Sequence, residues 1–223
     1  LRMKVLLVNP KTPLTFWNFE RALKIINKKS SEPPLGLITI ASLLPAEWSL
    51  KLIDMNVTEL LDNDIKWADF VFLGGMNVQI NSFKDVIKRC NLLETKIVVG
   101  GPLATTQHKD FLGVDHYVLN EAEITLPKFL KDLTNGNPKK IYSSDDFPDL
   151  KLSPMPKWEL LDIDKYATMT LQYSRGCPYD CEFCNVTTLF GHRPRMKTAA
   201  QIIAELDGLY DQGWRGSIFF VDD

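Results

Sequence analysis

Short apolar runs alternate with segments of helical periodicity between residues 4 and 135. Five of these runs are rich in β-branched and aliphatic residues, as buried strands are. They cover residues 4–9, 50–55, 70–74, 96–100 and 116–119. Strands that are apolar along their whole length are typical of a parallel sheet with helices on both faces. The pattern therefore predicts an α/β fold with a Rossmann-like, doubly wound parallel sheet.

Helical periodicity is clearest between the third and fourth expected strands. Apolar residues recur there at i, i+3, i+4 and i+7 over residues 83–90. The last of them is Cys90, which we interpret as a small core residue and not as a metal ligand. A second amphipathic helix is expected over residues 126–133, with Asn135 and Gly136 ending it. We place the end of the first domain at residue 136.

The next segment, residues 137–165, carries four prolines and mixed charges without a sustained period. Such a composition predicts a linker between domains. We expect its apolar residues to anchor it to the rest of the protein: Trp158, Leu160 and Leu161.

Residues 166–223 show the pattern of one β-α-β unit. A strand is expected over residues 169–174, and a second strand over residues 217–221. The helix between them begins with a capping box from Thr198 to Gln201 and stops at Gly213.

Charge and hydropathy exclude some classes of function. The 26 basic and 28 acidic residues are interspersed, so no basic surface for nucleic acid is expected. The longest apolar run, residues 35–44, is shorter than the roughly 20 residues that span a bilayer. The N-terminus has no signal-peptide pattern, and we expect a cytoplasmic location.

Three of the four cysteines lie within eight residues: Cys177, Cys181 and Cys184. In a reducing compartment this spacing favours a metal or cluster site over disulfides. Three thiolates on a four-iron cluster leave one iron open for a reactive ligand. The alternative is a zinc site with His192 as the fourth ligand. We favour the cluster, because zinc sites usually use paired hairpin knuckles, whereas this loop follows a single strand.

Residues 175–184 resemble the CxxxCxxC signature of the radical S-adenosylmethionine superfamily, including the aromatic residue before the third cysteine, Phe183. The resemblance implies that the three cysteines ligate a [4Fe-4S] cluster whose open iron binds S-adenosylmethionine, from which a deoxyadenosyl radical is released. Asp222 and Asp223 stand where the family has a polar motif near the methionine amino group. An ordinary strand-terminal turn is the other interpretation of this pair. The arginines of residues 191–195 could belong to a loop that reaches toward an anionic or carboxylate group, although arginines near the start of a helix are more often solvated.

Polar residues and glycines follow the expected strands, at the edge where open parallel sheets bind ligands. The sequence has no GxGxxG motif for a nicotinamide or flavin cofactor. Segments 33–37, 99–102 and 120–123 resemble the cobalamin-binding domain that precedes many radical S-adenosylmethionine domains. The last segment, Asn120-Glu121-Ala122-Glu123, stands where relatives often have Gly-Glu-Gly-Glu. The resemblance implies cobalamin contacts by residues at four strand ends: Asn9, Pro10, Gly74, Gly75, Met76, Asn77, Gly100, Gly101, Asn120 and Glu121.

The loop after the first strand, residues 10–17, contains no histidine and no Asp-x-His-x-x-Gly motif. If cobalamin binds, its lower face is therefore expected to lack a histidine ligand from that loop.

Essentially the whole chain resembles a subgroup of cobalamin-dependent radical enzymes that includes hopanoid methylases. The resemblance implies a cobalamin-binding domain (residues 1–136), a linker (137–165) and the first β-α-β of a TIM-like radical barrel (166–223). It also implies methyl transfer to an unactivated carbon of a lipid or other small molecule, with an external electron donor. The cofactors would be a [4Fe-4S] cluster, S-adenosylmethionine and cobalamin.

Three alternatives stay open at this point. The first is an anaerobic radical cyclase or oxidase of the same two-domain plan. The second is a non-catalytic fragment that binds cobalamin or a cluster, because a full barrel needs roughly 200 residues. In that case we expect a separate polypeptide to complete the barrel, and the isolated chain to cleave S-adenosylmethionine poorly or not at all. The third is a zinc-binding interaction module.

Overall fold

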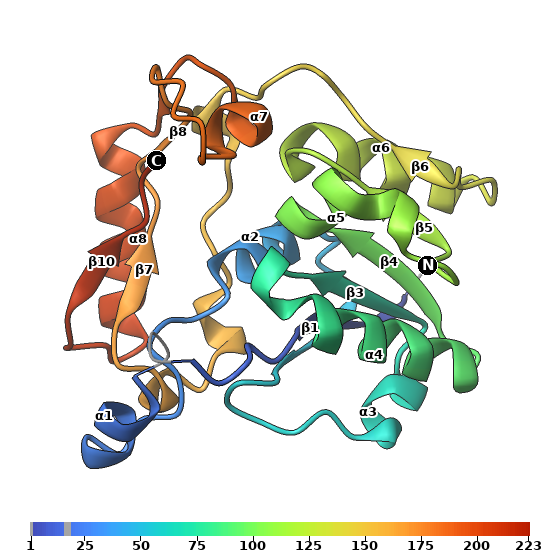
Figure 1. The fold of residues 1–223 in the computed structure, drawn as a ribbon, viewed down its shortest axis with the longest axis horizontal. Coiled ribbons are helices and arrows are strands. Elements are labelled where there is room, and N and C mark those ends of the chain that lie inside the picture. Colours follow the sequence, from blue (N-terminus) through green and yellow to red (C-terminus); the bar gives the residue numbers. More distant parts are fainter. Residues whose placement is uncertain (1, 16–18) are drawn as a thin grey trace.

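The computed structural model describes residues 2–15 and 19–223. Its first part is an α/β domain around a six-stranded, fully parallel sheet with the order β2-β1-β3-β4-β5-β6 (Figure 1). The strands are β1 (Lys4–Asn9), β2 (Ser49–Asp54), β3 (Phe70–Gly74), β4 (Lys96–Gly100), β5 (His116–Val118) and β6 (Ile141–Tyr142). The doubly wound sheet that the sequence predicts is therefore confirmed.

Helices cover both faces of the sheet because the strand side chains are apolar on both sides. One face packs against α3 (Asp62–Trp67), α4 (Ile80–Leu92) and α5 (Gly101–Gln107). The other face packs against α2 (Leu35–Leu43) and α6 (Ala122–Thr134). The short helix α1 (Glu20–Ile25) precedes α2 in the chain. In β1, Leu6 and Val8 point to the first layer and Val5 and Leu7 to the second, as the two-residue period of a strand requires.

The sixth strand lies inside the segment that the sequence predicts to be a linker. β6 has only two residues, which pair with Tyr117 and Val118 of β5. Two residues are too few to show a periodic pattern. Tyr142 of β6 is buried, and its hydroxyl group donates a hydrogen bond to Asp132 of α6 at 2.9 Å.

The rest of the predicted linker packs against α2. Trp158 anchors it there, as expected from the sequence. Trp158 is buried in a third apolar cluster with Ile38 of α2 and Tyr166. The same cluster contains Met169 and Leu209 from the C-terminal segment. A common apolar core therefore holds residues 166–223 against the first domain.

The C-terminal segment contains the expected β-α-β unit, drawn in orange and red in Figure 1. Strands β7 (Met169–Leu171) and β10 (Ile218–Phe220) are parallel neighbours, and α8 (Ala199–Asp211) connects them. The Thr198 capping box is present at the start of α8. Between β7 and α8 lie β8 (Ser174–Arg175), α7 (Val186–Phe190) and β9 (Arg195–Met196), and β8 pairs with β9 in antiparallel fashion.

The single strand predicted over residues 169–174 is divided into β7 and β8. The amide groups of Tyr173 and Ser174 donate hydrogen bonds to the Asp222 carboxylate, at 2.7 and 2.9 Å. Because these donors bond to a side chain, the strand ladder is interrupted there. None of the helices in the described ranges is long and apolar enough to cross a lipid bilayer.

Candidate functional site

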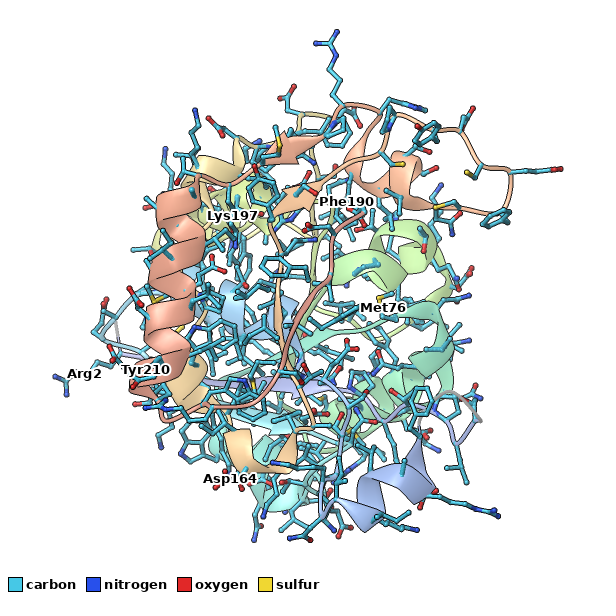
Figure 2. The ribbon with its side chains drawn as sticks, turned by 90° about the vertical axis from the view of Figure 1, so that its left-hand side faces the viewer. Arg2, Met76, Asp164, Phe190, Lys197 and Tyr210 are labelled. Carbon is cyan, nitrogen blue, oxygen red and sulfur yellow. The ribbon has the colours of Figure 1, made fainter. Side chains whose placement is uncertain are left out.

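A cavity of about 380 Å³ lies between the carboxyl ends of the sheet strands and the C-terminal segment. Residues after β1, β3, β4 and β5, together with α2, form one side of it, and α7, Gln172, Arg175 and Val221 form the other. Figure 2 labels one lining residue from each side, Met76 and Phe190. The strand order reverses between β1 and β3, and open α/β sheets bind ligands at such a switch point.

The structure brings together most of the residues predicted to contact cobalamin. Eight of the ten line the cavity: Asn9, Gly74, Gly75, Met76, Gly100, Gly101, Asn120 and Glu121. The other two, Pro10 and Asn77, are next to it in the chain but do not line it. The Pro10 carbonyl group accepts a hydrogen bond from Gln79 at 2.5 Å, and the Asn77 side chain accepts one from Gln107 at 2.8 Å.

Glycines leave part of the sheet edge of the cavity without side chains. A Cβ atom on Gly100 would lie 2.7 Å from the Val118 carbonyl oxygen, which is a backbone atom and cannot move aside. A Cβ atom on Gly36 of α2 would meet nothing within 4 Å, although Gly36 lines the cavity. Side chains are thus excluded at Gly100 for steric reasons, whereas at Gly36 the space is open.

Asn120 adopts the left-handed conformation, with φ of 61°. Glycine, and to a lesser degree asparagine, adopts this conformation at low cost. Asparagine at this position therefore fits the turn after β5. Ala122 is the first residue of α6 and needs no glycine.

Sequence reasoning missed Gln79, which joins the loops after β1 and β3. Its side-chain oxygen accepts a hydrogen bond from the Met76 amide group at 2.8 Å, while its amide group donates to Pro10. Gln79 is buried and lines the cavity. It lies in a short turn before α4, outside any periodic pattern, so no signal in the sequence indicates its role.

Glu121 binds two arginines of the C-terminal segment. Its Oε2 atom lies 2.8 Å from Nη1 of Arg175 and 3.0 Å from Nη1 of Arg195. Its Oε1 atom lies 2.7 Å from Nη2 of Arg195. Arg195 also donates to the carbonyl groups of Pro148 and Phe190, at 2.8 and 2.9 Å. Of the two interpretations of residues 191–195, binding to a carboxylate group is therefore confirmed for Arg195, and solvation is wrong for it, because its side chain is only 16% exposed.

Glu123 completes this ion-pair cluster. Its Oε1 atom lies 3.0 Å from Nη1 of Arg175. Burial opposes the positive charge of Arg175, but the Glu123 and Glu121 carboxylates outweigh it and raise the pKa of the guanidinium above its ordinary value. Arg175 therefore keeps its charge at the wall of the cavity.

The three predicted cluster ligands lie on one loop between β8 and α7. Their thiols are free; Cys181 is exposed, and Cys177 and Cys184 are half-buried. The loop extends outward at the upper right of Figure 2, in pale orange. In residues 2–15 and 19–223, no three His, Cys, Asp or Glu side chains are gathered in the geometry of a metal site. Phe183 is 92% exposed.

Asp222 and Asp223 bind the backbone at the start of this loop. Asp222 accepts the hydrogen bonds from Tyr173 and Ser174 described above, and Asp223 accepts one from the Gly176 amide group at 3.3 Å. Burial raises the pKa of the Asp223 carboxyl group, against the opposing effects of the Gly176 hydrogen bond and the Arg175 charge. These hydrogen bonds hold the start of the loop next to the end of β10.

Cys90 is confirmed as a core residue. It is fully buried in α4, and burial raises the pKa of its thiol to about 12. It lies in the core layer between α4 and the sheet, apart from the other three cysteines.

Comparison with known proteins identifies the first domain. Residues 23–130 match the model of the B12 binding domain family. The chain is 43% identical over 99% of its length to an uncharacterized methyltransferase of Synechocystis sp., and 34% identical over 99% to the hopanoid C-2 methylase of Rhodopseudomonas palustris. It spans 42% and 43% of the lengths of these two relatives.

Solved structures of TsrM, a radical S-adenosylmethionine methyltransferase from Kitasatospora setae, share the fold. The complex with tryptophan and a cofactor analogue superposes on 99% of this chain with a TM-score of 0.73 at 15% identity. The complex with cobalamin and a [4Fe-4S] cluster gives a TM-score of 0.66 at 14% identity over 100% of this chain, and in both cases 48% of TsrM is covered. The chain is thus a B12-binding domain protein related to a group of methyltransferases that includes hopanoid methylases.

Proposed function

We propose that this chain is the cobalamin-binding and cluster-binding part of a cobalamin-dependent radical S-adenosylmethionine methyltransferase. Its reaction would be methyl transfer to an unactivated carbon of a lipid or other small molecule. The observation that carries the proposal is the shared cavity. The carboxyl edge of the B12-binding domain forms one wall, and residues that flank the three-cysteine loop form the other.

The cavity has the chemistry of a corrinoid site. A corrinoid is a broad ring with amide side chains, which needs an apolar surface with amide and hydroxyl partners around it. Apolar residues of α2 and bare glycine backbone provide the surface, as described above. Amide and hydroxyl groups around it come from Asn9, Thr39, Gln79, Thr105, Asn120 and Gln172.

The cysteine loop has the donor set of a four-iron cluster. Three free thiols within eight residues supply three ligands and leave one iron open. Once bound, the cluster, S-adenosylmethionine and cobalamin supply a radical source and a methyl carrier. The protein's own residues hold these groups in place and exclude water, with Cys177, Cys181 and Cys184 as cluster ligands.

The relatives support this assignment. The hopanoid C-2 methylase is by name a methylase, and TsrM has been solved with cobalamin and a [4Fe-4S] cluster. We propose that this chain binds the same two cofactors. We also propose that S-adenosylmethionine binds near Phe183, Asp222 and Asp223, and that an external donor supplies the electron.

Anaerobic reconstitution tests the two sites separately. The chain is incubated with ferrous iron, sulfide and hydroxocobalamin, and iron and cobalt are counted after gel filtration. We expect about four iron atoms and one cobalt atom per chain, and absorbance at about 400 nm from the cluster. Replacing each loop cysteine by alanine should abolish the iron and retain the cobalt, whereas Cys90→Ala retains both. Bound zinc without that absorbance would identify a zinc module instead.

Residues 166–223 contain one β-α-β unit with two parallel strands, whereas a complete (β/α)8 barrel has eight strands and eight helices. We therefore propose that the isolated chain binds its cofactors but produces little deoxyadenosine. Robust deoxyadenosine formation by the 223-residue chain would contradict this proposal.

The kind of radical reaction is tested on a protein that includes this chain and the rest of a barrel. A methylated product that disappears when cobalamin is omitted supports the methyltransferase. Oxidised or cyclised product without methylation supports a radical oxidase or cyclase.

A further inference from the structure

The three-cysteine loop begins and ends at a very short ribbon. Residues 176–194 connect β8 to β9, and these two strands form only two residue pairs, one of them between Arg175 and Arg195. Two positive side chains directly opposite each other on a ribbon repel. The ribbon therefore needs a negative partner to keep both strands together.

The negative partner comes from the other domain. Glu121 precedes α6 at the carboxyl edge of the sheet, and it contacts both Arg175 and Arg195. Glu123, the second residue of α6, contacts Arg175 but not Arg195. The cluster contains two carboxylates and two guanidinium groups, so its charges balance.

Because these four side chains are largely buried, each charge needs its partner within the cluster. The side chains of Glu121 and Glu123 are 3% and 6% exposed, and those of Arg175 and Arg195 are 13% and 16% exposed. Removing one partner from a buried ion pair leaves an uncompensated charge, which costs far more than losing a surface pair.

Most other contacts at the ends of the loop lie within the C-terminal segment itself. The Cys177 amide group donates to the Gly191 carbonyl oxygen at 3.1 Å, and the Gly176 amide group donates to Asp223. Gly176 has φ of 96°, and a Cβ atom there would lie 2.6 Å from the Arg193 carbonyl oxygen. The two ends of the loop therefore approach closely, but backbone contacts alone do not fix them relative to the cavity.

We infer that Glu121 and Glu123 are positioning residues that fix the ends of the three-cysteine loop at the mouth of the cavity, by binding Arg175 and Arg195. The inference rests on the proposed function only in taking this loop as the cluster loop. The two glutamates act through the arginines. Glu121 and Glu123 of the B12-binding domain thus hold the neighbouring loop in place and also line the cavity.

Hydrogen exchange of the 223-residue chain without cofactors tests this inference. Amide exchange in residues 176–194 is compared among the wild type, Glu121→Gln, Glu123→Gln and Glu205→Gln. The last is a matched control, because Glu205 forms a similarly buried pair at 2.5 Å with Lys197, the residue that follows β9, but binds neither Arg175 nor Arg195. We expect Glu121→Gln to accelerate loop exchange at least about tenfold, Glu123→Gln to do so less, and Glu205→Gln not at all.

Two further measurements separate positioning from general loss of stability. Amides of β1 and β3 should exchange at the wild-type rate in Glu121→Gln, and Glu121→Asp, which keeps the charge, should restore part of the loop protection. Unchanged loop exchange in Glu121→Gln, or equal acceleration in Glu205→Gln, overturns the inference. If Glu121→Gln does not fold, Glu123→Gln decides: accelerated exchange confined to the loop supports the inference, and its absence overturns it.

Titration of each variant with hydroxocobalamin tests the proposed function independently. Failure of the wild type to bind cobalamin rejects that function and leaves the exchange result standing. Wild-type cobalamin binding with unchanged loop exchange in the glutamate variants supports the function and rejects the positioning role.

Discussion

Arg175 and Arg195 are direct cross-strand partners, and both place a guanidinium nitrogen within 2.8 Å of the same carboxylate, that of Glu121. Two like charges at opposing positions destabilise a ribbon when they stand alone. With Glu121 between them they connect three pieces of chain: the turn after β5, the start of the cysteine loop and its end. The two halves of the proposed cofactor site are joined at this point.

The geometry of Arg195 predicts a specific effect of lysine at this position. Its planar guanidinium group binds Glu121 and two carbonyl groups at once, and a lysine ammonium group cannot reproduce this fork. Arg195→Lys should lower the free energy of unfolding by about 1–3 kcal/mol in urea titrations. Arg193→Lys, at an exposed arginine of the same loop, is the control and should change it by less than about 0.5 kcal/mol. Equal effects of the two substitutions would show that the fork does not contribute.

Features that depend on nearby residues could be predicted from the sequence. The strands were visible as apolar runs, and the face of α4 that ends at Cys90 was visible as a helical period. The Thr198 capping box needs only residues three apart, and it is present. The glycines and asparagines at the strand ends were predicted to line a common site, because parallel strands all end at one edge.

Features that depend on distant polar contacts could not be predicted. The division between β7 and β8 follows from Asp222, which lies 48 and 49 residues from its two donors. The burial of Arg195 follows from Glu121, which is 74 residues away. A local hydropathy pattern contains no information about such partners, and β6 is too short to have a pattern at all.

The open space at Gly36 gives a direct test of the cavity. Gly36 lines the cavity, and a side chain at this position would meet no atom within 4 Å of its Cβ atom. Gly36→Phe should therefore leave the fold intact and weaken hydroxocobalamin binding at least about tenfold, which equals about 1.4 kcal/mol. Gly36→Ala, which adds a single methyl group, is the matched control and should bind nearly as the wild type does. Absorbance titration measures both, and unchanged affinity in Gly36→Phe would place the corrinoid elsewhere.

Cys90 should be inert in the folded protein. Burial raises the pKa of its thiol to about 12, so almost no thiolate forms at pH 8, and no reagent can reach the sulfur. Iodoacetamide at pH 8 should label Cys181 in the native chain and label Cys90 only after unfolding in urea. Peptide mass spectrometry measures both sites. Native labelling of Cys90 at the rate of Cys181 would mean that the core around α4 opens readily.

Glu205 should make stability depend on pH in a defined direction. Burial raises the pKa of its carboxyl group above 4.5, although the Lys197 ammonium group lowers it in part. The folded state thus holds the proton more tightly than the unfolded chain, and this contribution to stability is lost as the pH rises through the folded-state pKa. The difference in free energy of unfolding, wild type minus Glu205→Gln, should therefore decrease from pH 4.5 towards neutrality. Urea titrations at several pH values measure it, and an increase would reverse the sign that we assign.

The positions of the histidines predict the coordination of bound cobalamin. The loop after the first strand, residues 10–17, contains no histidine, and its residues 16 and 17 lie outside the described ranges. The three histidines of the chain, His108, His116 and His192, do not line the cavity.

A cobalt ion in this cavity should therefore have no imidazole ligand from the protein. The electron paramagnetic resonance spectrum of the reduced, cob(II)alamin-loaded chain should be identical whether its histidines carry ¹⁴N or ¹⁵N. The nuclear spins of the two isotopes differ, so a coordinated histidine nitrogen changes the hyperfine pattern on substitution. Because the isotope changes no contact, the comparison is free of any effect on folding. A spectrum that changes with histidine labelling would mean that one of the three histidines moves to the metal, and that the cavity rearranges when cobalamin binds.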